Sequence, residues 1–271
     1  MTMKTTRLLC ISLAAAGISL ASPTVSALTI GHFDGSREQW GFVGNNYLSS
    51  ARQWLVDNGH TLVSTNNADA AFLSTVDAFY TGLIGSVSAA EISAMQDFVD
   101  IEGGFLFIQQ DHSSGTWHAP SNQILNNWGI ANTAGTFSND LGHYTVGSSS
   151  WVTDPNVVAG FSGSAHSTID IAPVGFEVLA RDDLDRIIMG VFDAGAGRSS
   201  DVFVATDIDF WSDGFGWSDV RNRNLWENIW TSASVQIDPP DENGEVPEPA
   251  SIALIGMGLG LLGFARRRRY S

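Results

Sequence analysis

The feature that most restricts the fold is an alternation of amphipathic segments with short apolar runs in the first half of the chain. In residues 88–104, apolar side chains recur every three to four positions, which is the period of a helix. Ser88 and Glu91 have the spacing of a capping box at its start, and a Gly-Gly pair ends it. Residues 105–109, "FLFIQ", follow as an unbroken apolar run, typical of a strand covered on both faces. This order predicts an α/β fold with a parallel sheet flanked by helices.

The same alternation extends over much of the region 28–233, which has the length of one domain. Residues 130–192 differ, because Gly and Ser turns separate short apolar runs there. We therefore expect this stretch to form a β-rich insertion or an antiparallel extension of the sheet. Further strands are expected at 28–33, 61–64, 78–85 and 201–209, and further helices at 45–59 and 222–233.

The first 27 residues have the three parts of a secretory signal peptide. Lys4 and Arg7 give a basic start, and a run of small and apolar residues follows. Val25 and Ala27 then stand where small residues precede a cleavage site. The mature chain is expected to begin near Leu28. The alternative for this segment is a buried helix of the fold.

The other end of the chain has an acidic, proline-rich stretch at 234–245, which predicts a flexible linker, and then a tail at 246–271. A single transmembrane helix is expected over about 250–265. As a helix this run would rise about 24 Å, which is marginal against a hydrocarbon core of about 30 Å. By the positive-inside rule, the arginines that follow are expected to stay cytoplasmic. They are Arg266, Arg267, Arg268 and Arg269.

This tail resembles the PEP-CTERM sorting signal of Gram-negative bacteria. Pro247, Glu248 and Pro249 come first, followed by a glycine-containing apolar run and the terminal arginines. The resemblance implies that exosortase, a membrane protease-transpeptidase, recognises Pro-Glu-Pro and removes the tail. It also implies a protein that is transiently anchored in the inner membrane and then reaches the cell envelope, the outer surface or the extracellular matrix. The alternative is a transmembrane anchor that is not processed.

Charge and cysteine content exclude several classes of function. The formal net charge is −16, and outside the two ends only seven arginines and no lysine stand against 29 acidic residues. Such a surface repels phosphate, so a nucleic-acid partner is excluded. The chain's one cysteine, Cys10, lies in the predicted signal peptide. The mature domain is therefore expected to have no disulfide, no thiolate metal ligand and no cysteine nucleophile.

Polar residues follow the predicted parallel strands at the side of the sheet where ligands bind in open α/β folds. Two hypotheses apply to them. Carboxylate oxygens suit a divalent cation such as Ca²⁺ or Mg²⁺, whereas an aspartate at a strand end also commonly caps the next helix. The candidate ligand or metal residues are Asp34, Asp111, His112, Asp207 and Asp209.

The body of the chain resembles class I glutamine amidotransferase-like domains and their non-catalytic relatives. The resemblance rests on residues 88–111, 156–163, 187–211 and 222–230. It implies a flavodoxin-like fold, with a nucleophilic cysteine after the fourth strand and a histidine and a glutamate after the last. Here those turns read "QQDHSSG" and "TDIDFWSDG", so the triad is absent. Because acyl transfer needs a nucleophile beside a base, no catalytic residue is assigned and the domain is expected to lack amidotransferase activity.

The nine tryptophans allow a glycan-binding surface or a tryptophan-rich core. Five of them fall in loop-like stretches, and exposed aromatic rings there would stack on sugars. They are Trp117, Trp128, Trp151, Trp211 and Trp217. The sequence therefore favours an exported, non-catalytic protein linked to the envelope or to extracellular polysaccharide. The rival hypothesis is a surface hydrolase, metal-assisted, that acts on glycans.

Overall fold

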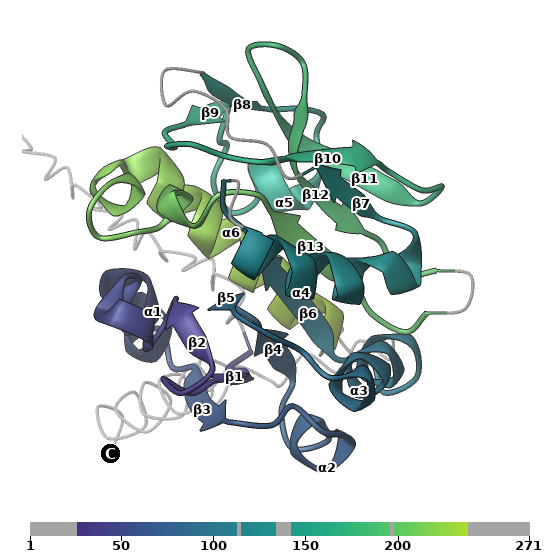
Figure 1. Ribbon diagram of the computed structural model, residues 1–271. Coiled ribbons are helices and arrows are strands. Elements are labelled where there is room, and N and C mark those ends of the chain that lie inside the picture. The colour runs from purple at the N-terminus through teal and green to yellow at the C-terminus, as the bar shows by residue number, and fades with distance from the viewer. Residues whose placement is uncertain (1–25, 113–114, 134–141, 196–197, 238–271) are drawn as a thin grey trace, which may run out of the picture.

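The computed structural model describes residues 26–112, 115–133, 142–195 and 198–237 (Figure 1). Its centre is a nine-stranded sheet in the order β3-β1-β4-β6-β13-β12-β11-β8-β9. The first five strands in this order are parallel, and their order is that of flavodoxin-like sheets. The parallel strands are β1 (Thr29–Phe33), β3 (Thr61–Thr65), β4 (Ala78–Tyr80), β6 (Phe105–Gln109) and β13 (Val202–Ala205).

The rest of the sheet is an antiparallel extension of the parallel half. This resolves the two expectations for residues 130–192, because most of their strands continue the central sheet. The added strands are β8 (His143–Thr145), β9 (Gly160–Phe161), β11 (Phe176–Asp182) and β12 (Ile187–Phe192). Two small two-stranded sheets lie apart: β2 (Glu38–Trp40) with β5 (Leu83–Ile84), and β7 (Ala131–Thr133) with β10 (Thr168–Ile171).

Helices cover both faces of the sheet (Figure 1). One core layer packs against α1, α5 and α6 and holds the buried Trp211, Trp226 and Trp230, while the other packs against α2, α3 and α4. The α-helices are α1 (Ser49–Asp57), α2 (Ala70–Leu73), α3 (Ala89–Asp100), α4 (Gly115–Leu125), α5 (Ser150–Thr153) and α6 (Val220–Ile237). Short 3₁₀ turns are η1 (Gly44–Asn46), η2 (Asn126–Trp128), η3 (Ile208–Phe210) and η4 (Gly216–Ser218).

The helix-strand unit at residues 88–109 forms as the sequence predicts. Ser88 caps α3 and Glu91 completes the capping box, and every residue of β6 is buried. Such a strand can only lie inside a sheet with both faces covered. The α/β expectation is therefore confirmed at its centre.

Several boundaries differ from the sequence-based expectation. The strand expected at 78–85 is two strands, because Gly82 takes a positive φ of 60° and turns the chain out of the central sheet. α4 was not predicted, and α5 lies in a stretch where only strands were expected. α6 continues to Ile237, so its last turn lies in the segment predicted as linker.

Candidate functional site

We call the side of the sheet where the parallel strands end the carboxyl edge. Four of the five predicted ligand residues lie there, since Asp111 and His112 follow β6 while Asp207 and Asp209 follow β13. Asp207 is fully buried, and Asp111 and Asp209 are buried to more than nine-tenths. Burial, together with the charges of Asp209 and Asp111, raises the pKa of Asp207 well above its ordinary value.

Asp207 acts as a helix cap. Its carboxylate accepts one hydrogen bond from the Asp209 amide and one from the Ser164 amide, both at 2.8 Å. It is the N-cap of η3, so the capping role considered for these aspartates is what the structure shows at this position. The bond from Ser164 also joins the antiparallel half to the carboxyl edge.

Asp111 and His112 form one turn. Oδ1 of Asp111 accepts a hydrogen bond from the His112 amide at 2.7 Å and lies 2.9 Å from the Nδ1 of the same residue. Burial raises the pKa of Asp111 to about 6, and the charge of Asp209 acts in the same direction. The imidazole of His112 is 43% exposed, so this pair is the part of the group that faces solvent.

Asp209 bonds to a residue far away in sequence. Its Oδ1 accepts a hydrogen bond from the hydroxyl of Tyr47 and another, at 3.0 Å, from the hydroxyl of Ser212. Burial, followed by the bond to Asp209, raises the pKa of Tyr47. Tyr47 is thus a neutral donor that fixes the Asp209 carboxylate.

Asp34 does not join this group. Its carboxylate accepts hydrogen bonds from the amide and the hydroxyl of Ser36, at 2.9 and 2.5 Å. Both bonds lower the pKa of Asp34, and the bond from the hydroxyl has the larger effect. The predicted five-residue site is therefore divided, with Asp34 engaged in its own turn.

The metal hypothesis receives no support from the described part of the chain. No three carboxylate, imidazole or thiolate side chains come together there as a group that could hold a metal ion. Both carboxylate oxygens of Asp207 already accept a backbone hydrogen bond.

A cavity of about 430 Å³ opens in the loop between β1 and α1. Its walls are mostly polar and include one aromatic ring. They comprise Gly35, Ser36, Glu38, Gln39, Trp40, Val43, Gly44 and Asn45. Trp40 contacts Tyr47 edge-on, with ring centroids 4.7 Å apart, so one wall of the cavity packs against the tyrosine that bonds to Asp209. The side chain of Trp117, on α4, donates a hydrogen bond to Oε1 of Gln39 at 2.6 Å.

Glu38 organises the wall of this cavity. The residue is 2% exposed, and its Oε2 accepts hydrogen bonds from the amides of Val43 and Gly44 at 2.7 and 3.1 Å. A methyl group on Gly41 or Gly82 would overlap its Oε1. Burial outweighs the amide donors and raises the pKa of Glu38 to about 7.

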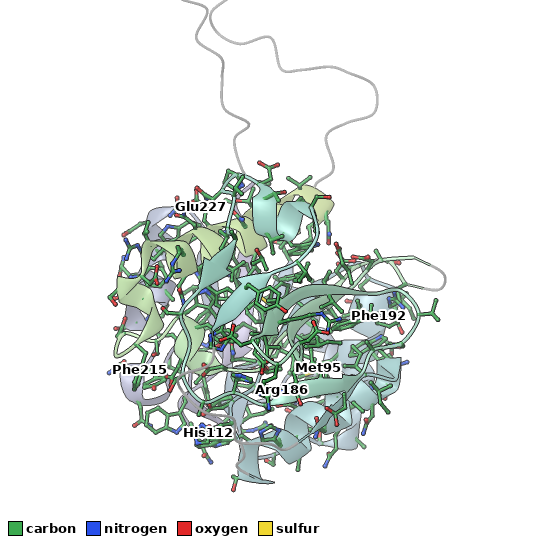
Figure 2. The ribbon with its side chains drawn as sticks, turned by 90° about the horizontal axis from the view of Figure 1, so that it is seen from above. Met95, His112, Arg186, Phe192, Phe215 and Glu227 are labelled. Atoms are coloured by element: carbon green, nitrogen blue, oxygen red, sulfur yellow. The ribbon has the colours of Figure 1, made fainter. Side chains whose placement is uncertain are left out.

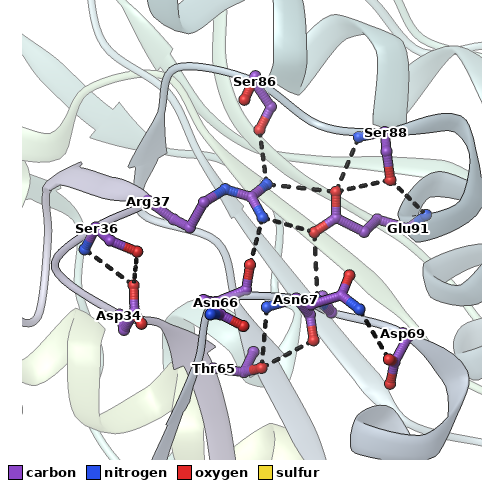
Figure 3. A network of polar contacts seen from close by, with 11 residues as sticks. Asp34, Ser36, Arg37, Thr65, Asn66, Asn67, Asp69, Ser86, Ser88 and Glu91 are labelled. Carbon is purple, nitrogen blue, oxygen red and sulfur yellow. Dashed lines mark hydrogen bonds and ion pairs between the residues drawn. The ribbon is translucent and has the colours of Figure 1, made fainter.

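An ion pair fixes the same loop to α3 (Figure 3). The guanidinium of Arg37 donates to both carboxylate oxygens of Glu91, at 2.9 and 3.3 Å, and to the carbonyls of Asn66 and Ser86. Glu91 also accepts from Ser88. The loop is thus preorganised by contacts with residues distant in sequence.

The tryptophans divide differently from the expectation. Trp128, Trp151 and Trp211 are buried in the core, whereas Trp117 and Trp217 are half-buried. Trp40 is half-buried, packs against the core and lines the cavity. Figure 2 shows His112 and Phe215 on the same side of the molecule and Glu227 on the opposite side.

Glu38, Gln39 and Tyr47 were missed by sequence reasoning. The available signal was "EQWGFVG" at 38–44, where two glycines closely follow an acid. That spacing leaves room for the chain to fold back over the carboxylate, but the third glycine, Gly82, lies far away in sequence, in the turn between β4 and β5.

The comparisons with known proteins concern the tail first. Residues 245–269 match the family described as the PEP-CTERM protein-sorting motif. The chain ends in a PEP-CTERM motif. This motif supports an exported protein that exosortase sorts to the envelope of a Gram-negative bacterium. The PEP-CTERM residues Pro247, Glu248, Pro249 and Arg266 to Arg269 lie outside the described residues, as does the helix predicted at 250–265. Among the described helices, none has the length and apolar character needed to cross a membrane.

Two solved structures share the fold of the domain that precedes the PEP-CTERM motif. The mmIFT52 N-terminal domain has a TM-score of 0.65 at 13% identity, over 76% of this chain and 97% of that one. A Thermoplasma acidophilum protein named as part of GMP synthase has a TM-score of 0.50 at 9% identity, over 78% and 96%. A ThuA-like protein from Bacteroides uniformis scores 0.49 at 11% identity, over 75% and 90%. At these identities the likeness concerns the fold alone. No curated protein sequence matches the chain.

Proposed function

We propose that this protein is exported with a cleaved signal peptide, is processed by exosortase, and binds extracellular polysaccharide through its carboxyl edge without catalysing a reaction. The PEP-CTERM motif supports the export and sorting. The binding proposal adds the ligand class and the surface. Release from the inner membrane would leave the domain in the envelope or in the extracellular matrix.

The observation that carries the binding proposal is the polar cavity with Trp40 in its wall and Trp117 held beside it by Gln39. Sugars present both hydroxyl groups and an apolar C–H face, so they suit a site that combines amides with half-buried indole rings. A neutral polysaccharide fits best, because the acidic chain repels anionic groups.

The proposal that the domain is not a catalyst rests on its residues. Cys10 is the chain's one cysteine and precedes the domain. At the end of β6, where the resembled family has its nucleophile, stand Gln110 and Asp111. Asp111 pairs with His112 there, and among the residues that the structure describes at this turn, 110–112, there is no hydroxyl or thiol to serve as the nucleophile.

The binding test uses the processed protein secreted by its host and the neutral polysaccharide extracted from the same culture. Trp40→Ala and Trp117→Ala should each weaken co-sedimentation with the polysaccharide by about tenfold. Trp54→Ala is the matched control and should leave binding unchanged, since Trp54 lies on α1 and does not line the cavity. Equal binding by all four proteins would reject the proposed surface.

A second candidate, a surface glycan hydrolase, is favoured by one observation. Asp111 has a pKa of about 6 and lies near Asp209, so one carboxyl group is suited to donate a proton while the other is fixed by Tyr47. Asp111→Asn should then abolish release of reducing ends from the same polysaccharide. If the wild-type protein releases none, with or without added divalent cation, the hydrolase hypothesis fails.

A further inference from the structure

The start of β1 lies at the opposite side of the sheet, which we call the amino edge. Here the chain passes from the surface into the core within two residues. Ala27 is exposed, whereas Leu28 is 2% exposed and is the first residue of the core. The bond between Ala27 and Leu28 therefore marks the boundary between an exposed residue and the first residue of the core.

The backbone at this point is held by side chains from two other segments. The amide of Leu28 donates a hydrogen bond to Nδ1 of His60 at 3.1 Å. The next amide, of Thr29, donates to Oδ2 of Asp77 at 2.6 Å. The Leu28 carbonyl accepts from the amide of Thr61 at 2.8 Å. The acceptors of the Leu28 and Thr29 amides are side chains, not neighbouring strands of the sheet. The imidazole of His60 and the carboxylate of Asp77 therefore fix the start of β1.

His60 is well defined in this role. It is 5% exposed, lies near the rings of Trp54 and Trp230, and donates its own amide to the Leu55 carbonyl at the end of α1. Burial lowers its pKa, so the ring is neutral at physiological pH and Nδ1 is available as an acceptor. The carbonyl end of α1 adds negative partial charge nearby.

We propose that cleavage between Ala27 and Leu28 creates an α-amino group that stays seated against His60 and beside Asp77, and so anchors the mature N-terminus. This inference rests on the proposed export. In the cleavage, the leader-removing endopeptidase adds water across the peptide bond. Ala27 leaves with a carboxylate, and the nitrogen of Leu28 takes the hydrogen and then a proton. The resulting ammonium keeps a donor for Nδ1 of His60 and gains an attractive charge from Asp77 and from the end of α1.

The sequence makes this site directly measurable. Lys4 is the chain's one lysine, so a chain that begins at Leu28 has the α-amine as its one primary amine. Reductive methylation with formaldehyde and cyanoborohydride then labels this group alone, and the rate of labelling reports its exposure.

The experiment exports the full chain from a Gram-negative host and identifies the first residue by mass spectrometry. We expect Leu28. In the native protein the α-amine should be methylated about tenfold or more slowly than in the same protein unfolded in urea. His60→Phe fills the space between the two indoles but cannot accept a hydrogen bond, and should raise the native rate several-fold. Arg223→Met is the control. Arg223 lies near the start of α6, whereas Trp230, which lies near His60, is further along that helix, so this variant should leave the labelling rate unchanged.

The anchor is overturned if the first residue is not Leu28, or if the native amine reacts as fast as the unfolded one. This comparison of native and unfolded wild type holds even if His60→Phe fails to fold. Recovery of the chain in the cytoplasm with Met1 in place would instead reject the export itself, and the first residue tells these failures apart.

Discussion

Arg37 and Glu91 form a two-point ion pair that joins the loop lining the cavity to the first turn of α3. The two nitrogen–oxygen distances are 2.9 and 3.3 Å, and the side chain of Glu91 is 4% exposed. Burial of Glu91 opposes its ionisation, but Arg37 and Ser88 outweigh it and lower its pKa. The pair therefore fixes the position of the loop as well as of the helix.

Loss of this ion pair should be costly. Arg37→Met leaves the buried Glu91 carboxylate without its cation, and the free energy of unfolding should fall by about 2–4 kcal/mol. Arg221→Met is the matched control. Its partner is Asp219, but the side chain of Arg221 is 56% exposed, so the loss should be below about 1 kcal/mol. Urea unfolding measures both, and equal losses would contradict the role given to Arg37.

Glu38 should make stability depend on pH near neutrality. Its pKa in the folded chain is about 7, against an ordinary value of 4.5. Its contribution is complete below pH 4.5 and is lost as pH rises through 7. Glu38→Gln keeps the shape and removes the titration. Relative to wild type, the variant's free energy of unfolding should increase by about 2–3 kcal/mol between pH 5 and pH 8. Parallel pH profiles for the two proteins would rule this out.

His143 should make the protein less stable as the pH falls, whereas Glu38 does so as the pH rises. Burial, followed by the neighbouring His166, lowers its pKa from 6.5 to about 4. Because the unfolded chain binds this proton more readily, stability is complete above pH 6.5 and falls as pH drops toward 4. His143→Phe packs against the same rings of Phe161 and Phe210 and should lose about 2–3 kcal/mol less than wild type between pH 7 and pH 4. An unchanged acid profile in the variant would show that His143 is not responsible.

Gly82 and Gly59 offer a comparison between two glycines with positive φ, 60° and 90°. At Gly59 no atom lies within 4 Å of an added methyl group, so Gly59→Ala meets only backbone strain, about 1–2 kcal/mol. At Gly82 the methyl group overlaps Glu38, so Gly82→Ala should cost about 3 kcal/mol or more. Chemical denaturation of both variants provides the measurement. Similar losses would mean that Glu38 does not occupy the position described.

The sequence predicted the parts of the fold that local patterns encode. The capping box of α3 and the apolar run of β6 are local, so both were found. The antiparallel half was left open, because the pairing of β8 with β11 depends on contacts between segments far apart in sequence. α4 was missed because its sequence, "GTWHAPSNQIL", contains Pro120 and lacks a clear helical period.

The sequence likewise predicted only part of the candidate site, namely the part that follows from the order of the strands. Asp111, Asp207 and Asp209 meet because the ends of parallel strands share one edge. Asp34 shares that edge as well, but its own turn engages its carboxylate. The burial of Glu38 depends on Gly82, and the position of Tyr47 depends on Asp209, 162 positions away. Neither relationship leaves a local pattern.

Export followed by exosortase processing underlies the proposed function, and the intact mass of the protein tests it directly. The full chain is produced in a Gram-negative host with its exosortase gene intact and in the matched deletion strain, and envelope, medium and cytoplasm are separated. The intact strain should yield an envelope or extracellular protein that lacks the residues before Leu28 and the tail after the Pro-Glu-Pro motif. The deletion strain should retain the tail in the inner membrane. Full-length protein in the cytoplasm of both strains, with Met1 and Ser271 in place, would contradict both export and processing.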